Sequence, residues 1–166
     1  MSTNKTAEED EDLELEKYKE DNSSVTLRTH EEINRGLCGD IEKLEVGYVE
    51  LRLTTTEDMV ADSLGLIHGG FIFGAADYAA MAAINERNVV LVASECQFLS
   101  PVKLHDDVII IAKVRHKEGR KRNVRVEGFV FDIKVFEGEF KTVITERHIL
   151  KLHLLEESDD KKAGKK

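Results

Sequence analysis

One aspartate stands inside an apolar, alanine-rich stretch of the chain. Residues 64–85 read LGLIHGGFIFGAADYAAMAAIN, and Asp77 is the only acid among them. An ionised carboxylate in apolar surroundings loses its water and needs a partner, and desolvation raises its pKa toward the range that suits a general base. Asp77 is therefore either a structural acid, bonded to a loop or a second subunit, or the catalytic carboxylate of an active site.

A glycine pair, Gly69 and Gly70, precedes Asp77 within this stretch and favours the catalytic interpretation. The first N–H groups of a helix have no intrahelical partner and lie at the positive end of its dipole, so they suit an oxyanion hole. Asp77 lies roughly 10 Å further along the same helix, too far for both groups to reach one carbonyl carbon. A two-fold partner would bring the acid of one chain to the glycines of the other, which indicates a homodimer.

The helix that carries Asp77 is expected over residues 70–85. It contains six alanines among other apolar residues, and a helix that is apolar almost all round is a buried one. A second, short helix is expected over 29–36, with Thr29 as its N-cap and Gly36 as its stop.

The rest of the chain favours β-structure. Alternating apolar residues predict a hairpin over 40–56, broken at Gly47. Turns are expected at Gly119 and Gly138, and the strands after Asn88 are expected over 89–99, 107–117, 122–136 and 139–152. Strands do not alternate with helices, so the fold class is α+β, with an antiparallel sheet curled around one long central helix.

The ends of the chain differ from its middle in composition. Nine acids and three lysines give residues 1–22 a net charge of −6, so the rest of the chain carries −3 of the total −9. We expect a disordered acidic tail over 1–24, one folded domain over 25–155 and a flexible charged tail over 156–166. The role of the acidic arm stays open.

Composition also limits the classes of function. The chain has no basic footprint for nucleic acid, no apolar run of about 18 residues for a membrane span, and no secretory signal. Cys38 and Cys96 form no metal motif and no disulfide framework, which favours a cytoplasmic protein with free thiols and no metal site. The aromatic residues Phe71, Phe73 and Phe98 are expected in the core.

Two stretches, GLIHGGFIFGAADYAAM (65–81) and ECQFLSPVKLHDDVIIIAKV (95–114), resemble the hotdog-fold acyl-CoA thioesterases, in the phenylacetyl-CoA thioesterase-like branch. The shared elements are His-Gly-Gly, a carboxylate nine positions after the histidine, and Ser-Pro-Val-Lys followed by acids. The resemblance covers about residues 33–150. It implies a hotdog fold, an acyl-CoA substrate hydrolysed without metal or redox cofactor, and homodimers that share active sites and often pair into homotetramers.

The resemblance also implies roles for individual residues. Gly69 N–H would polarise the thioester carbonyl, beside Gly70, and Asp77 would act as the general base for water or as the attacking carboxylate. His68 would shape the turn and contact the site. Asp62 stands where relatives carry Asn or Asp and could hold water, but Asn is commoner there, so the role of Asp62 is open.

Residues 115–125 are strongly basic. Coenzyme A carries a pyrophosphate and a 3′-phosphate, which suit arginine side chains, so Arg120 and Arg122 are candidate phosphate ligands. The alternative is a solvated hairpin turn.

Two other functions compete with hydrolysis. Hotdog domains also serve as non-catalytic acyl-CoA sensors in transcription regulation, which carry a DNA-binding domain before the hotdog and often lack the helix acid; this N-terminus is short and acidic, and Asp77 is present. Hotdog hydratases use a His/Asp site elsewhere in the fold, and no matching spacing precedes the helix here. The acyl chain is not determined.

Overall fold

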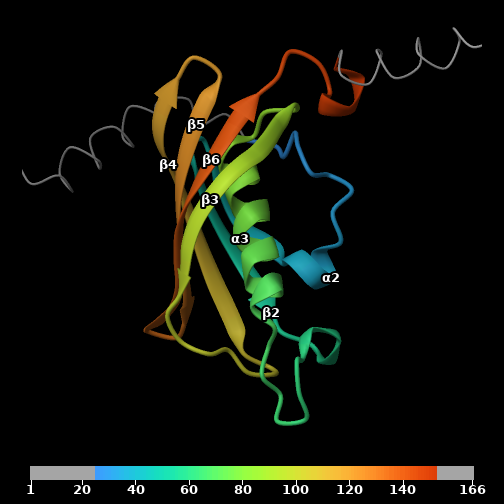
Figure 1. Ribbon diagram of the computed structural model, residues 1–166, viewed down its shortest axis with the longest axis vertical. Helices are drawn as coiled ribbons and strands as arrows, with labels where there is room; N and C mark the ends of the chain where they lie inside the picture. Colours follow the sequence, from blue (N-terminus) through green and yellow to red (C-terminus); the bar gives the residue numbers. More distant parts are fainter. Residues whose placement is uncertain (1–24, 153–166) are drawn as a thin grey trace, which may run out of the picture.

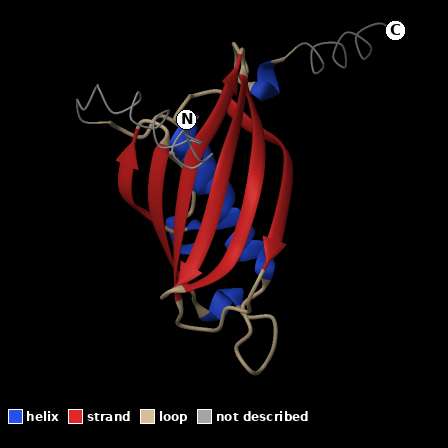
Figure 2. Ribbon diagram, turned by 90° about the vertical axis from the view of Figure 1, so that its left-hand side faces the viewer, coloured by secondary structure: helices blue, strands red, loops and turns tan. Residues whose placement is uncertain are grey.

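The computed structural model describes residues 25–152, which form one six-stranded antiparallel sheet curled around a single long helix (Figures 1 and 2). The helical elements are α2 (Arg35–Cys38), η1 (Glu57–Met59), α3 (Gly69–Ile84) and η2 (Ile149–Lys151). The strands are β1 (Asp40–Glu45), β2 (Tyr48–Thr54), β3 (Val89–Phe98), β4 (Asp107–Glu118), β5 (Lys121–Val130) and β6 (Ile133–Ile144). The predicted tails, and residues 153–155 of the predicted domain, lie outside the described residues.

The sheet has the strand order β1-β2-β4-β5-β6-β3, and each pair of neighbours is antiparallel. The strands curve around α3, which lies in the hollow of the sheet in Figure 1 and behind the sheet in Figure 2. The predicted hairpin turns at Gly47, whose φ is 76°, as expected. The predicted α+β class, with an antiparallel sheet wrapped around one long helix, is confirmed.

The composition of α3 explains how closely the sheet surrounds it. All six of its alanines are buried, together with Ile72, Tyr78 and Met81. An Ala side chain supports the helix and adds little width, so the strands pack against the helix backbone from several sides. Asn85 ends the helix in the left-handed conformation. Among the described helices, none has the length and hydropathy needed to cross a membrane.

The helix predicted over 29–36 is wrong. Residues 25–34 contain no helix, and α2 begins only at Arg35, with Gly36 inside it. The reason lies at the predicted start of the helix: His30 has a φ of 53°, outside the α-helical region, and the hydroxyl of Thr29, the expected N-cap, lies 2.8 Å from His30 Nδ1. Just before it, the side chain of Asn85 accepts a hydrogen bond from Arg28 N–H at 2.7 Å and donates one to the Thr26 carbonyl at 2.8 Å. These bonds use backbone groups of the segment itself and hold it against the end of α3.

The turn predicted at Gly138 is also wrong. Strand β5 ends at Val130, the chain turns at Phe131, whose φ is 52°, and Gly138 lies inside β6, paired with Cys96 of β3. A Cβ atom on Gly138 would stand 2.7 Å from the Cβ of Cys96, closer than real carbon atoms approach. Gly138 is therefore required by the close contact of two strands and not by a turn.

Phe98 was expected in the core and is more than half exposed. It lies at the end of β3, the edge strand, where only one side of the strand has a neighbour in the sheet. Phe71 and Phe73 are partly buried and pack against the core. Position on the edge of the sheet, which the sequence pattern does not reveal, explains the difference.

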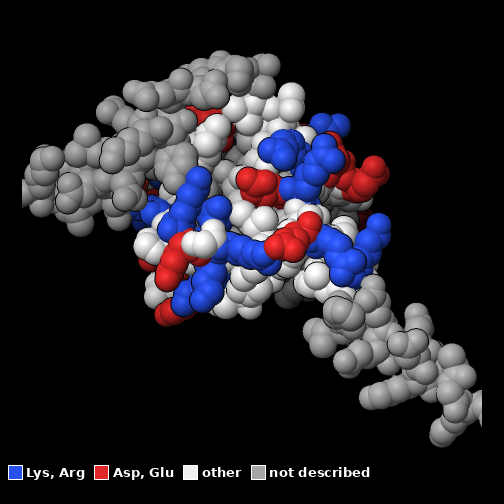
Figure 3. Space-filling model, turned by 90° about the horizontal axis from the view of Figure 1, so that it is seen from above, with Lys and Arg blue, Asp and Glu red and all other residues white. Residues whose placement is uncertain are grey.

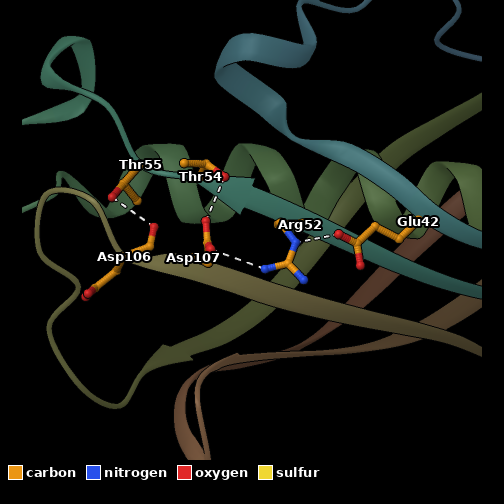
Figure 4. A network of polar contacts seen from close by, with 6 residues as sticks. All are labelled: Glu42, Arg52, Thr54, Thr55, Asp106 and Asp107. Atoms are coloured by element: carbon orange, nitrogen blue, oxygen red, sulfur yellow. Dashed lines mark hydrogen bonds and ion pairs between the residues drawn. The ribbon is translucent and has the colours of Figure 1, made fainter.

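A polar network ties the end of β2 to the loop before β4 (Figure 4). The buried hydroxyl of Thr55 donates to the carbonyl oxygens of Lys103 and Asp106, each at 3.0 Å. Thr54 donates to the Asp107 carboxylate at 2.7 Å, and Arg52 bridges Asp107 to Glu42 of β1. The loop 99–106 is thereby fixed to the sheet.

The close contact at Gly138 yields a stability prediction. Gly138→Ala forces the new methyl group against Cys96 and lowers the free energy of unfolding by about 1–3 kcal/mol, measured by urea denaturation. Combining it with Cys96→Gly removes the clash, so the double variant loses less stability than the sum of the two single variants. Additive losses would contradict the proposed contact.

Candidate active site

A single stripe of α3 is left partly uncovered by the sheet. Gly70, Gly74 and Asp77 lie on it, at spacings of four and three residues, and each is only partly buried or exposed. Nothing lies within 4 Å of the position that a Cβ atom on Gly74 would occupy. The stripe therefore presents two glycines and, at its C-terminal end, one carboxylate.

Asp77 has the environment of a reactive acid. Its Oδ1 atom is buried and has no hydrogen-bond partner among the described residues. Burial raises the pKa of Asp77 from 3.8 to about 6. The side chain lines an open cavity of about 490 Å³. A buried carboxylate oxygen without a partner destabilises a fold, and it is typical of a functional site.

His30 and Arg87 line the same cavity and were missed by the sequence analysis. His30 has a φ of 53°, its Nδ1 lies 2.8 Å from the hydroxyl of Thr29, and its ring stacks on Tyr78. Burial lowers the pKa of His30. No spacing in the sequence connects position 30 with position 77, because the connection exists only through the packing of segment 25–34 on α3.

The glycine pair stands at the start of α3, where the first N–H groups of a helix have no intrahelical partner. Neither Gly69 N–H nor Gly70 N–H donates a hydrogen bond to another described residue. A Cβ atom on Gly69 would stand 3.2 Å from the ring of Phe98, and one on Gly70 would stand 3.1 Å from the ring of His68. Gly69 lines a cavity of about 240 Å³ that also contains Phe98. The free N–H group of Gly69 beside this cavity suits a developing oxyanion.

His68 occupies the N-cap position of α3 with an exposed ring, and its side chain makes no capping hydrogen bond. The ring packs edge-on against Phe71, with centroids 6.2 Å apart. His68 therefore directly precedes the glycine pair, and its roles in shaping the turn and contacting the site stay predictions.

The single chain does not bring the two predicted catalytic groups together. Asp77 and Gly69 line different cavities, and eight residues of helix correspond to a rise of roughly 12 Å. Each chain thus carries the acid at one place on α3 and the N–H donors at another.

Asp62 is exposed, and its carboxylate is used within its own loop. Its Oδ1 accepts hydrogen bonds from Leu64 N–H at 2.9 Å and Leu66 N–H at 3.1 Å. This shapes the loop that leads to His68, and an asparagine oxygen could accept the same bonds. The structure places Asp62 away from the Asp77 cavity of the same chain, and a water-holding role stays a prediction.

Arg120 and Arg122 lie at the β4–β5 turn and both have partners. Arg120 pairs with Glu146, and Arg122 donates to the carbonyl oxygens of Gly119 at 2.7 Å and Lys121 at 2.9 Å. Figure 3 looks down on this end of the molecule, where acidic side chains stand among the basic ones. A role in phosphate binding stays a prediction for both. Within residues 25–152, no three His, Cys, Asp or Glu side chains cluster to hold a metal ion.

Comparison with known proteins places this geometry in context. The family model for the thioesterase superfamily matches residues 64–137, which include α3 and both predicted catalytic groups. A crystal structure of an uncharacterised protein from Pyrococcus horikoshii is 42% identical, covers 76% of this chain and 98% of its own, and superposes with a TM-score of 0.75. The PaaI protein of the E. coli phenylacetic acid degradation operon is 25% identical, covers 69% of this chain and 84% of its own, and has a TM-score of 0.63.

Two curated proteins are similar over part of their length. A protein of Aquifex aeolicus named methylthioribose-1-phosphate isomerase is 52% identical over 119 residues, which is 72% of this chain and 26% of that protein. Transcription factor FapR of a Thermoanaerobacter species is 29% identical over 69% of this chain and 58% of its own length. The chain therefore spans about a quarter to three fifths of these two relatives.

The raised pKa of Asp77 makes a prediction for stability. The folded pKa of Asp77, about 6, exceeds its unfolded value of 3.8, so between these two pH values the folded state binds more protons than the unfolded state. Asp77 therefore progressively destabilises the fold as pH rises from 4 to 6. Asp77→Asn removes this penalty. Its free energy of unfolding should match that of the original chain near pH 4 and exceed it by up to about 3 kcal/mol above pH 6.

The control is Asp58→Asn, which removes a charge at an exposed position outside this cavity. It measures the general effect of changing the net charge by one unit. A difference between Asp77→Asn and the original chain that stays constant from pH 4 to pH 8 would show that Asp77 is not desolvated in the folded protein.

Proposed function

Because the chain belongs to the thioesterase superfamily and its sheet and helix form a hotdog fold, we propose that it hydrolyses acyl-CoA thioesters to the free acid and CoA. The observation that carries this proposal is the state of Asp77. Its buried oxygen has no partner in the described chain, and its pKa is raised to about 6. Such a carboxylate is ionised at neutral pH and is a stronger base than an exposed one, so it suits the removal of a proton from water.

We place the active site between two copies of the chain. The outer edge of β3 has no neighbour in the sheet, and Val92 on that strand is 59% exposed. The stripe of Gly70, Gly74 and Asp77 on α3 is partly uncovered, and nothing lies within 4 Å of the Cβ position at Gly74. A second chain packed on this face with its α3 antiparallel would set Asp77 of one copy beside the Gly69 N–H of the other. Further pairing into a tetramer stays open.

The reaction then follows from these two groups. Asp77 takes a proton from water as the water oxygen bonds to the thioester carbon, and the carbonyl electron pair moves to the oxygen. Gly69 N–H, at the positive end of α3, stabilises that oxyanion. When the carbonyl re-forms, the carbon–sulfur bond breaks and CoA leaves as the thiolate, which takes up a proton. If Asp77 attacks the carbon itself, water hydrolyses the resulting anhydride, and the mechanism still uses Asp77 and the Gly69 N–H.

Other residues support this site in the proposal. His68 and Gly70 shape the turn that presents Gly69, and Asp62 holds the preceding loop. Arg120 and Arg122 are proposed to attract the phosphates of CoA, in exchange for some of their present partners. The mechanism needs no metal or redox cofactor, and a cytoplasmic location is part of the proposal.

A second candidate function is acyl-CoA binding without turnover. The similarity to the transcription factor FapR favours it. It requires no base in the site, whereas this chain places an unpaired carboxylate there at an energetic cost. We therefore rank hydrolysis first and distinguish the two by assay.

The assay measures release of free thiol from a panel of acyl-CoA esters. Asp77→Asn keeps the shape of the side chain and removes the base, so kcat should fall by about 10²–10⁴ while KM changes little. For the original chain, kcat/KM should decline as pH falls below about 6, following protonation of Asp77.

Asp58→Asn serves again as the matched control and should retain full turnover. An active Asp77→Asn variant would remove Asp77 from the mechanism. Tight binding of acyl-CoA to the original chain with no release of thiol would favour the sensor.

Substitution of Gly74 tests the proposed packing of two α3 helices between copies of the chain. The space around Gly74 is empty in the single chain, so Gly74→Leu should fold normally but block the approach of a second α3. We expect its molar mass by light scattering to fall to that of one chain, with loss of turnover. Gly74→Ala is the graded control and should stay associated. A fully active, associated Gly74→Leu variant would contradict the proposed interface.

A further inference from the structure

The end of the molecule where α3 begins holds a cleft that the proposed chemistry does not use. Its volume is about 600 Å³, within the range of ligand sites. Three loops form it: residues 62–66, residues 100–106 and the β5–β6 turn. Most of its surface is carbon, and its apolar side chains include Leu64, Leu66, Val130, Phe131 and Ile133.

This cleft is adjacent to the cavity beside Gly69. Ser100, Pro101, Val102 and Val135 line both. A group bonded to a carbonyl carbon at Gly69 would reach the cleft by passing along residues 100–102. One of the two arms of a thioester, the acyl chain or the pantetheine of CoA, would follow it.

The walls of the cleft are held together by backbone hydrogen bonds. Ile67 N–H donates to the Val102 carbonyl at 2.9 Å, and Leu104 N–H donates to the Gly65 carbonyl at 2.8 Å. Leu99 N–H donates to the Val135 carbonyl at 2.8 Å, and the Thr55 hydroxyl fixes the loop 99–106 through its carbonyl oxygens (Figure 4). A ligand thus meets a formed cleft and does not have to order it.

The mouth of the cleft is apolar to an unusual degree. Leu64 and Phe131 are each 92% exposed, although large apolar side chains favour burial. They stand on different loops and line the same opening. A nonpolar ligand that passes between them would cover part of this surface.

The charges at the rim decide which arm fits. The charged side chains of the cleft are Asp62, Asp106 and Lys103, and the Lys103 ammonium lies 3.2 Å from the Asp106 carboxylate. The net charge is therefore negative, which repels the phosphates of CoA. The pantetheine arm has two amide groups that would face carbon without partners, whereas an alkyl chain has none.

We propose that this cleft binds the acyl chain of the substrate and selects esters of medium and long alkyl chains over acetyl-CoA. The inference rests on the proposed thioesterase function, since it takes the carbonyl to lie at Gly69. Leu64 and Phe131 are then specificity residues at the outer end of the acyl site.

The test is the dependence of kcat/KM on chain length for acetyl-, hexanoyl- and decanoyl-CoA. Each methylene that enters the cleft should raise kcat/KM by up to about fourfold, until the cleft is full. In the double variant Leu64→Ser, Phe131→Ser, the ratio of kcat/KM for decanoyl-CoA to that for acetyl-CoA should fall at least about tenfold. Both residues are exposed, so the fold should be unaffected, and urea denaturation checks this.

Leu150→Ser is the matched control, because Leu150 is 69% exposed on η2 and lies outside the cleft. In this variant, the ratio of kcat/KM for decanoyl-CoA to that for acetyl-CoA should equal the ratio of the original chain. A profile that is flat with chain length in the original chain would overturn the proposal. If kcat/KM of the double variant fell equally for every ester, the cleft would bind the CoA part of the substrate and not the acyl chain. If the double variant changed its molar mass by light scattering, the cleft would be a contact between copies of the chain.

A binding experiment separates failure of the acyl site from failure of the proposed function. If the original chain hydrolyses no ester, calorimetric titration still measures its affinities for decanoyl-CoA and acetyl-CoA. Tighter binding of decanoyl-CoA that the double variant loses would support the acyl site in a non-catalytic protein. Equal affinities for the two esters would overturn it.

Discussion

The close packing of α3 into the hollow of the sheet is the constraint on which the rest of this structure depends. Six buried alanines keep the helix narrow, and a narrow helix lets strands approach it from several sides. The sheet covers most of its circumference and leaves one stripe, along which Gly70, Gly74 and Asp77 lie. A second copy that packs on α3 would meet this stripe and the partly buried Phe71 and Phe73 beside it, because the other residues between Ile72 and Ala83 are buried.

Packing of α3 against the sheet does not explain why the stripe contains an aspartate at position 77. Its buried oxygen has no partner in the described chain, and its pKa is raised toward neutrality. An alanine at this position would suit the helix better and would avoid the desolvation cost. His30, with its backbone in the left-handed conformation, stands in the same cavity. Strained or unpaired groups gathered at one cavity are typical of sites kept for chemistry and not for stability.

The molecule separates its polar and apolar chemistry between two ends. The β4–β5 turn carries basic side chains interspersed with acids, whereas the opposite end presents Leu64 and Phe131 around a carbon-lined cleft (Figures 1 and 3). Both features depend on the sheet: β4 and β5 project the basic turn, and the loops that end β2, β3 and β5 form the cleft. The hydroxyl of Thr55 connects two of these loops through two carbonyl oxygens.

Local sequence determined the elements whose signals come from neighbouring residues. The periodicity and composition of 70–85 predicted α3 to within a residue of each end, Gly47 and Gly119 marked true turns, and the glycine pair with Asp77 identified the candidate catalytic groups. Only the tertiary structure showed that Gly138 serves a contact between strands, that Asn85 holds residues 26–28 against the end of α3, and that His30 shares the cavity of Asp77. Each of these depends on residues more than forty positions apart in sequence, and the backbone freedom of a glycine or the capping ability of a threonine does not reveal which distant group will approach it.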